Sequence, residues 1–286
     1  MRDGAGVRGD RRPDPGAGRA RRRQGMGVRR FGRVNWLGTW TLTMREVRRF
    51  TNVWTQTLAA PVATAALFMA VFTLAIGAGR TTADGAPFAH FLAPGILMMT
   101  VIQNAFSNTS SSILISKVQG NIVDTLMPPL SPAELLAGFV TGGVLRGLAV
   151  ALAVGVVIFP FVGVGLAHPL WALGFVLAGA AMMALIGLVV GIVAEKFDHL
   201  AALTNFVVTP LSFLSGTFYS VEVLPGAMQT AIHFNPFFYL IDGMRYASLG
   251  AGDAAPALGL GVVVAVDLGL AALTLRWLRL GYKLKP

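Results

Sequence analysis

The sequence predicts an all-α integral membrane protein with six transmembrane helices and both termini in the cytoplasm. Of the 286 residues, 55% are hydrophobic and only 13% are charged, whereas a soluble domain carries about 25% charged residues. Several uncharged stretches reach the roughly 20 residues that a membrane-spanning helix needs. Lys and Arg are also distributed very unevenly along the chain. Together these observations exclude an ordinary cytosolic globular protein.

The net charge of +10 belongs to the N-terminal part of the chain. Residues 1–50 hold fourteen arginines and four acidic residues, whereas residues 51–286 hold nine basic and nine acidic residues. Residues 1–33 are rich in Gly, Arg, Pro and Asp, which predicts a disordered basic tail. The tail is either an arm for anionic lipid or nucleic acid or, as we favour, sequence upstream of a true start at Met26. We expect no nucleic-acid partner, and the first apolar run near residue 53 begins too late for a cleavable signal peptide.

Residues 34–52 predict an amphipathic helix lying in the cytoplasmic headgroup layer. Trp36 and Trp40 recur with other apolar residues at steps of three and four, and Trp and Arg together are typical of the membrane interface. The alternative is that this segment only flanks the first span. Four charged residues are expected to crowd the opposite side of the helix: Arg45, Glu46, Arg48 and Arg49.

Stretches with few or no charged residues define the six expected spans. Arg146 lies within the third span and Asp267 within the sixth, and ionisable residues inside a membrane are functional candidates because they are costly there. The alternatives are structural pairing and, for Arg146, extension of its side chain toward the headgroups. The spans are expected at about residues 53–78, 89–110, 137–160, 170–193, 201–219 and 255–275.

The distribution of basic residues predicts the orientation. With the N-terminus inside, the inner segments carry twenty Lys and Arg, and the outer segments carry only Arg80 and Arg245. Cytoplasmic loops are enriched in these residues, so both termini are expected in the cytoplasm.

The inner loop between the second and third spans predicts a short helix at residues 121–127. Gly120 ends the incoming helix, and Pro128 and the prolines after it stop the short one. Ser131 and Glu134 have the spacing of a capping box, which marks the start of the third span. A short, partly apolar helix of this kind suits docking of a partner, and an ordinary tight loop is the alternative.

The outer segment, residues 220–254, is too apolar for a free loop and too interrupted for a span. Pro225 begins an amphipathic helix, Asn235 and Pro236 break it, and a second short helix follows. Asp242 and Arg245 are three residues apart and can pair on one helix face; a structural pair is favoured over a catalytic one. Non-helical backbone at membrane depth must be buried or line a wet cavity, so we expect short re-entrant helices.

Motifs of enzymes are lacking. The chain has no cysteine, and its four histidines show no metal-ligand spacing. It contains neither a P-loop nor a nucleophile-elbow motif. We therefore expect no catalytic residue, no metal and no cofactor in this chain, which indicates a membrane subunit powered by another chain.

Four stretches in order resemble the type-2 ABC transporter permeases, bacterial exporter subunits that include drug-resistance, nodulation-factor and polysaccharide export permeases. The resemblance covers about residues 35–286, and the fourth stretch is its most specific part. The stretches are PGILMMTVIQNAFSNTSSSI (94–113), GNIVDTLMPPLSPAELLAGFVTGGVLRG (120–147), LTNFVVTPLSFLSGTFYSVEVLP (203–225) and NPFFYLIDGMRYASLG (235–250).

The resemblance implies a homodimer in the bacterial inner membrane, in contact with lipids, with two cytoplasmic ATPase subunits that bind ATP and Mg. Residues 34–52 then match the connecting helix, 119–130 the coupling helix and 222–250 the helices that close the exit. The residues expected to couple to the ATPase are Asn121, Ile122, Asp124, Thr125, Leu126 and Met127. Glu195, Lys196 and Asp198, in the inner turn, form either a second ATPase contact or a solvated loop. The outer gate residues are Asn235, Pro236, Phe237, Tyr239, Asp242 and Arg245.

The implied mechanism is alternating access, or lateral entry and extrusion, of a hydrophobic or lipid-linked substrate. Spans two and five would line the path with Phe106, Asn108, Phe213 and Phe218, although such residues also suit a plain core. One alternative is an ion-driven carrier, for which Asp267 is the one carboxylate in a span. Another is an enzyme acting on lipid-linked glycans, whose polar residues should converge at one depth.

Overall fold

The computed structural model describes residues 34–76, 87–221 and 224–283. It divides the chain into two units, Met1–Asn35 and Trp36–Pro286, and the second contains all of the described helices. The predictions of a basic tail at residues 1–33 and a start at Met26 lie outside the described residues. The outer-loop residue Arg80 lies outside them as well.

The regular elements among the described residues are helical, which confirms the all-α class. Short π-helical segments, labelled η, adjoin the α-helices of the first and fifth spans. In chain order the elements are α2 (Trp36–Thr51), η1 (Thr55–Ala59), α3 (Ala60–Ile76), α4 (Phe88–Val118), α5 (Ile122–Leu126), α6 (Pro132–Val162), α7 (Pro169–Val193), α8 (Phe197–Leu203), η2 (Thr204–Val208), α9 (Thr209–Ser212), η3 (Phe213–Thr217), α10 (Gly226–Ile232), α11 (Pro236–Leu249) and α12 (Pro256–Leu280).

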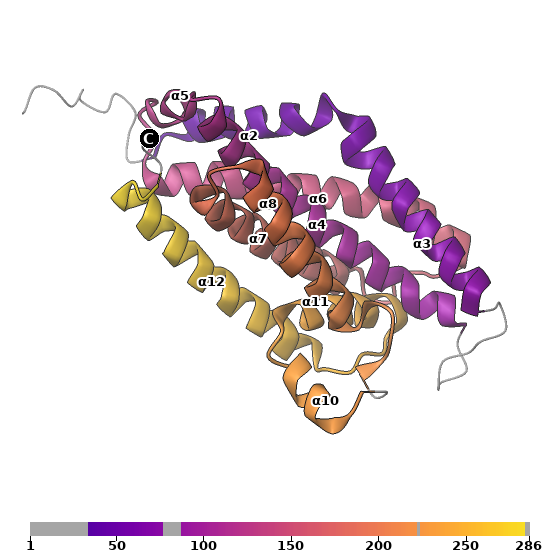
Figure 1. Ribbon diagram of the computed structural model, residues 1–286. Coiled ribbons are helices and arrows are strands. Elements are labelled where there is room, and N and C mark those ends of the chain that lie inside the picture. The colour runs from indigo at the N-terminus through magenta and orange to yellow at the C-terminus, as the bar shows by residue number, and fades with distance from the viewer. Residues whose placement is uncertain (1–33, 77–86, 222–223, 284–286) are drawn as a thin grey trace, which may run out of the picture. The chain divides into compact units, whose positions relative to one another are not determined.

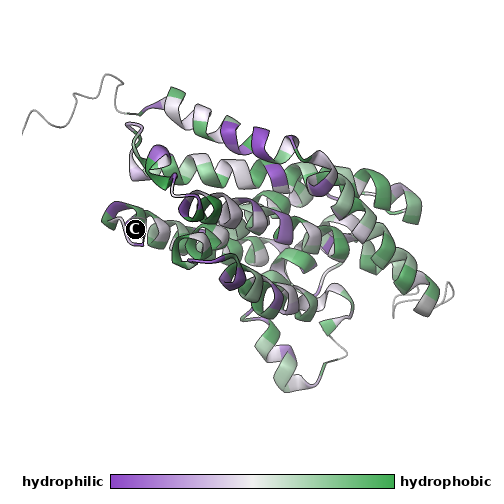
Figure 2. Ribbon diagram, turned by 45° about the horizontal axis from the view of Figure 1, so that its top comes forward, coloured by the Kyte–Doolittle hydropathy of each residue, from purple (hydrophilic) through white to green (hydrophobic). Residues whose placement is uncertain are grey.

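Within the described ranges, six segments are long and apolar enough to cross a membrane, and each overlaps one expected span. Hydrophobic residues predominate along these helices (Figure 2). The segments are Thr55–Leu74, Phe88–Val118, Pro132–Val162, Pro169–Val193, Phe197–Thr217 and Pro256–Leu280.

Helices α4 and α6 are longer than expected. Each has 31 residues, which corresponds to about 46 Å of helix. Helix α4 continues beyond the expected end of the second span at residue 110, because the serine-rich stretch that follows is still helical. Its hydroxyls donate to carbonyls four residues earlier, at 2.5 Å from Ser111 Oγ to the Ser107 oxygen and 3.0 Å from Ser116 Oγ to the Ser112 oxygen.

The local signals around the second loop are confirmed. Gly120 has a φ of +73°, a left-handed conformation that glycine adopts at no steric cost. Ser131 Oγ accepts from the Glu134 backbone N–H at 3.4 Å, and a Glu134 carboxylate oxygen accepts from the Ser131 N–H at 2.6 Å. This capping box starts α6 five residues before the expected span.

Helix α4 is the central element of the second unit, since it packs extensively on α7 and α6 and also contacts α3 and α11. In Figure 1, α5 and the C-terminal end of α12 lie at one end of the bundle, and α10 and α11 lie at the opposite end. We call these the α5 end and the α10 end.

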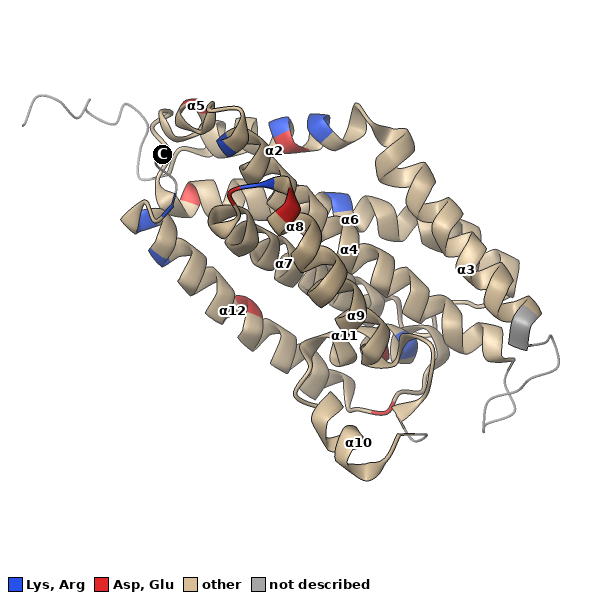
Figure 3. Ribbon diagram, in the orientation of Figure 1, with Lys and Arg blue, Asp and Glu red and all other residues tan. Residues whose placement is uncertain are grey.

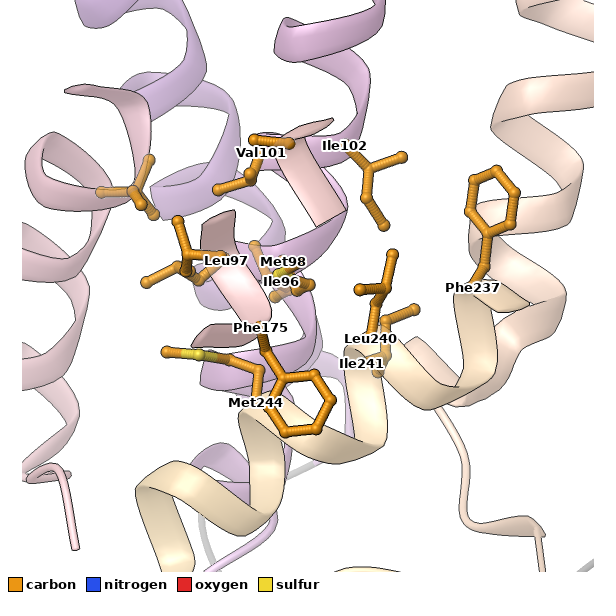
Figure 4. Close-up of a cluster of buried hydrophobic side chains, with 14 of the residues drawn as sticks. Ile96, Leu97, Met98, Val101, Ile102, Phe175, Phe237, Leu240, Ile241 and Met244 are labelled. Carbon is orange, nitrogen blue, oxygen red and sulfur yellow. The ribbon is translucent and has the colours of Figure 1, made fainter. Parts of the chain in front are cut away.

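Side chains of α4, α7 and α11 form the main core. Ile96 and Met98 of α4 face Leu240 and Ile241 of α11, with Phe175 of α7 beside them (Figure 4). All five are fully or almost fully buried. The core therefore joins the second and fourth spans to a helix that is too short to be a span.

Close approach of α4 and α7 depends on glycine. A Cβ added at Gly187 would lie 2.2 Å from Thr109 Oγ1 and 2.6 Å from the Phe106 carbonyl oxygen. A backbone oxygen cannot move aside as a flexible side chain can. The backbones of α4 and α7 therefore approach each other closely at Gly187.

We predict that Gly187→Ala destabilises the protein by about 1–3 kcal/mol, because the added methyl group forces α4 and α7 apart. Gly261→Ala, in α12, is the matched control because nothing lies within 4 Å of its added Cβ. Thermal unfolding of both variants in detergent checks this. Equal unfolding temperatures for the two variants would show that the α4–α7 contact is not tight.

Candidate functional site

Helix α5 presents an apolar tip on a buried anchor. Ile122 is 5% exposed and packs with Leu42 of α2 and Leu135 of α6. Val123 and Met127 are 48% and 75% exposed. Ile122 is therefore part of the anchor rather than of the exposed surface, and Val123 and Met127 form the tip.

The remaining coupling candidates surround this tip. Asn121 precedes the first turn of α5, and Asp124 is exposed whereas Leu126 is half-buried. Thr125 is 8% exposed, and its hydroxyl oxygen accepts a hydrogen bond from Arg45 Nη1 of α2 at 3.0 Å. Arg45 thereby connects α5 directly to α2.

Glu46 of α2 is a fully buried carboxylate, so its expected position on the charged outer side of the helix is wrong. Its Oε1 accepts from Arg45 Nη2 at 3.0 Å and from Ser112 Oγ of α4 at 2.8 Å. Its Oε2 lies 3.1 Å from Arg49 Nη2. The side chain packs on Gly142 of α6, where an added Cβ would approach it to 2.5 Å.

Arg49 continues this network along α4. It donates to Ser111 Oγ at 3.0 Å and to Asn108 Oδ1 at 3.1 Å, and also to the Asn108 carbonyl oxygen. Asn108 itself has no exposed surface. A cavity of about 310 Å³ adjoins the network, lined among others by Arg45, Arg49 and Asp124.

Arg146 of α6 is half-buried near the middle of the third span. Its Nη2 donates to Asn104 Oδ1 of α4 at 3.0 Å, and its Nε is buried without a partner among the described residues. Asp267 is not its partner, because Asp267 Oδ1 is itself buried and unpartnered in the described part of the chain. The two charges within spans therefore do not pair.

The turn between α7 and α8 is tied to the end of α12. Lys283 Nζ donates to a Glu195 carboxylate oxygen at 3.2 Å, and this bond lowers the pKa of the exposed Glu195 carboxyl. Lys117 of α4 donates to the Ile192 and Ala194 carbonyl oxygens at 2.8 and 2.6 Å. Charged side chains are frequent at this α5 end and sparse along the bundle (Figure 3).

The other two charged candidates of this turn, Lys196 and Asp198, are exposed. Lys196 immediately precedes α8, and Asp198 lies in its first turn. Their role as a second ATPase contact stays a prediction.

At the α10 end, Asp242 and Arg245 of α11 are buried and 3.8 Å apart. Asp242 accepts from the Asp253 and Ala254 N–H groups at 2.8 and 2.9 Å. Arg245 Nη2 donates to the Gly216 carbonyl oxygen at 2.7 Å. These contacts support a structural role for the pair, because they bind α11 to the loop before α12 and to the bend in the fifth span; its place in an outer gate stays a prediction.

The start of α11 contacts the same bend. Asn235 Oδ1 accepts from the Phe237 N–H at 3.0 Å, and its Nδ2 donates to Ser215 Oγ at 2.8 Å. Pro236 occupies the first turn, while Phe237 and Tyr239 are buried.

The preceding helix α10 has both exposed and buried apolar side chains. Met228 and Phe234 are 51% and 85% exposed, and Ile232 is buried. Phe234 follows the end of α10, which comprises seven residues, and Val223 lies outside the described residues.

The four residues expected along the path are in two different settings. Phe106 and Asn108 are buried in the bundle, 1% and 0% exposed, and their place along a path formed by two copies of the chain stays a prediction. Phe213 and Phe218 are half-buried and their rings stack at 5.1 Å. Phe218 also stacks on Phe72 of α3 at 4.6 Å.

A second cavity, of about 640 Å³, lies between α6 and α7 and is lined almost wholly by apolar side chains such as Leu152, Phe159 and Leu173. In the described part of the chain, no three His, Asp or Glu side chains are grouped so that they could hold a metal ion.

Sequence reasoning missed Glu46, Arg49 and Asn104 as site residues. The signal for Glu46 was its spacing, since Leu42, Glu46 and Phe50 recur every four residues and so share the buried face of α2. The charge of Glu46 argued against its burial, because a carboxylate is rarely fully buried unless it is paired.

A bundle of six potential spans, with a short helix projecting at one end, is the architecture of a multi-pass membrane protein. The family model of the ABC-2 type transporter matches residues 38–249. The chain therefore belongs to the ABC-2 type transporter family, which confirms the resemblance, and it is a multi-pass transport permease of the inner membrane.

Relatives agree with this assignment. The inner membrane transport permease YadH of Escherichia coli K12 is 36% identical over 80% of this chain and 90% of its own length. Nodulation protein J of Rhizobium leguminosarum bv. viciae is 25% identical over 81% and 89%. The daunorubicin resistance ABC transporter permease protein DrrB1 of Streptomyces coeruleorubidus is 29% identical over 72% of each chain.

We predict that Glu46→Ala destabilises the protein by about 1–3 kcal/mol, because it leaves the buried Ser112 hydroxyl without its acceptor and the half-buried Arg49 guanidinium without its counter-charge. Glu195→Ala removes the exposed partner of Lys283 and should have little effect, since exposed ion pairs contribute little. Chemical or thermal unfolding in detergent measures both variants. A Glu46→Ala protein as stable as the wild type would show that the network is not a structural requirement.

Proposed function

We propose that this permease is the membrane subunit of an ATP-driven exporter, acting as a homodimer with two cytoplasmic ATPase subunits that bind ATP and Mg. The observation that carries this proposal is α5, whose apolar tip at Val123 and Met127 is exposed although the helix is firmly anchored. Exposed apolar side chains on a rigid support are suited to a partner surface. The Streptomyces relative is itself named an ABC transporter permease.

The contacts of α2 provide a route for coupling. Arg45 bonds Thr125 of α5, and the adjacent Glu46 bonds Ser112 of α4. When the ATPases close on ATP and displace α5, α2 and α4 therefore move with it. The path would then open and close through α4 and the fifth span.

A half-buried polar stripe on α4 supports a second copy of the chain. Gln103, Ser107 and Ser111 recur every four residues and are only partly covered. Polar groups at membrane depth must face protein or water, so this stripe suits a path between two copies. The transported molecule would be hydrophobic or lipid-linked and would move outward.

An ion-driven carrier is the second candidate, favoured by the unpartnered Oδ1 of Asp267. Transport that persists in ATP-depleted vesicles under a proton gradient, and that is lost in Asp267→Asn, would favour this alternative. Transport that requires ATP and the ATPase subunit would exclude it.

We predict that a Val123→Asp/Met127→Asp variant loses most of its association with the ATPase, at least tenfold, because a carboxylate would be desolvated at each contact. Met228→Asp is the matched control, since Met228 is also exposed but lies in α10. Copurification of the ATPase from membranes measures the association. Equal copurification of both variants would rule out α5 as the docking helix.

The chain has no cysteine, so single introduced cysteines can test the orientation. We predict that Asp124→Cys reacts with a membrane-impermeant maleimide only after the membrane is permeabilised, whereas Met228→Cys reacts from the periplasmic side. The reverse pattern would place α5 outside and would contradict the proposed coupling.

A further inference from the structure

The buried network around Glu46 has no hydrogen-bonding capacity left for Arg146. Both carboxylate oxygens of Glu46 are engaged, by Arg45, Arg49 and Ser112. Gly142 packs on Glu46, and Arg146 follows it by one helical turn on the same face of α6. Arg146 is thus beside the network but outside its charge pairing.

The polar groups that remain free at this position are donors. Asn104 is satisfied, since its Oδ1 accepts from Arg146 and its Nδ2 donates to the Thr100 carbonyl oxygen at 3.0 Å. Asn108 Oδ1 accepts a hydrogen bond from Arg49, so Nδ2 is the part of this amide that is without a partner in the described part of the chain. Within the described residues, Asn108 Nδ2 and Arg146 Nε are both buried and unpartnered. What these atoms lack is an acceptor.

The charged groups beside Arg146 also favour an anion at this position. Arg45 and Arg49 both pair with Glu46, and Asp124 lines the same cavity as these two arginines. Arg146 has no carboxylate partner among the described residues and bonds only the neutral Asn104 amide. Arg49 bonds Asn108, and Arg146 bonds Asn104 one turn earlier on α4, so an anion bound beside these two amides would be attracted by both guanidinium groups.

The position of these donors limits the kind of anion. Asn104 and Arg146 both lie near the middle of 31-residue helices, at a depth where a free, hydrated ion would have to lose its water. Both helices are predominantly apolar and span-like. An anionic group carried on an apolar chain reaches this depth at lower cost than a small ion.

We propose that Arg146, with Asn104 and Asn108 beside it, forms a site for the anionic headgroup, phosphate or carboxylate, of an amphiphilic molecule that the permease transports. The site deepens the proposed function and rests on it for the statement that the bound molecule is transported. Arg146 supplies the charge, Asn104 orients its guanidinium, and Asn108 offers a further N–H donor. The cavity lined by Arg45 and Arg49 adjoins the site through Arg49.

The test measures binding to the purified full-length chain in a neutral maltoside detergent, without ATP or ATPase. The probes are dodecyl phosphate and, separately, inorganic phosphate, titrated by isothermal calorimetry. We expect dodecyl phosphate to bind, Arg146→Gln to weaken it about tenfold or more, and Arg146→Lys to retain much of the affinity. Arg276→Gln is the control, because it removes an exposed charge from α12 and should leave binding unchanged.

Several results would overturn the proposal. Absence of dodecyl phosphate binding by the wild-type chain would overturn it. An equal loss of affinity in Arg146→Gln and Arg276→Gln would also overturn it, because such a result indicates a general charge effect. Binding of inorganic phosphate as tight as that of dodecyl phosphate would overturn the proposal that the ligand is an amphiphile. If Arg146→Gln does not fold, Asn108→Ala removes one donor without changing charge and should weaken binding about threefold; unchanged affinity there would also count against the site.

A second measurement separates this site from the exporter function. The permease is reconstituted with its ATPase, and ATP-dependent movement of a fluorescent long-chain alkyl phosphate is followed in vesicles. Binding that depends on Arg146 without ATP-driven transport would support the anion site while contradicting the exporter. Transport that is unaffected by Arg146→Gln, together with unchanged binding, would overturn the site while supporting the exporter.

Discussion

The Glu46 carboxylate is a negative charge with no solvent-exposed surface, and much of the α5 end is arranged around it. Removing an ion from water costs several kcal/mol even after relaxation, unless its lone pairs are satisfied. Arg45 and Arg49 of α2 and Ser112 of α4 meet this need, and Gly142 of α6 leaves room for the side chain. Three helices that are distant in sequence are therefore held in one register.

This constraint connects the surface to the interior. Arg45 holds Thr125 of the exposed helix α5 and also Glu46, while Arg49 holds Asn108 of α4. Helix α4 in turn packs closely on α7 through Gly187 and on α11 through the main core. Hydrogen bonds therefore run from α5 through Arg45, Glu46 and Arg49 of α2 to Asn108 of the second span. The proposed coupling to an ATPase rests on this chain of contacts.

The opposite end uses ion pairing differently. Asp242 and Arg245 satisfy backbone groups of neighbouring segments at the bend in the fifth span, so their charges stabilise irregular backbone that cannot hydrogen-bond to lipid. Among the described residues, Arg245 Nε is buried without a partner at this end, whereas two such donors, Arg146 Nε and Asn108 Nδ2, belong to the region beside Glu46. The proposed anion site rests on these two donors together.

The number and order of the spans, the short helix between Gly120 and Pro128, the capping box at Ser131 and the family all follow from the sequence, because hydrophobic length, turn residues and motif spacing are local properties. The burial of Glu46, the separation of Arg146 from Asp267 and the burial of Phe106 do not follow from it. These depend on which helix faces are brought together, and an apolar or charged residue has the same local signal on either face. These features are set by tertiary packing, in which Gly142 and Gly187 allow neighbouring helices to approach closely.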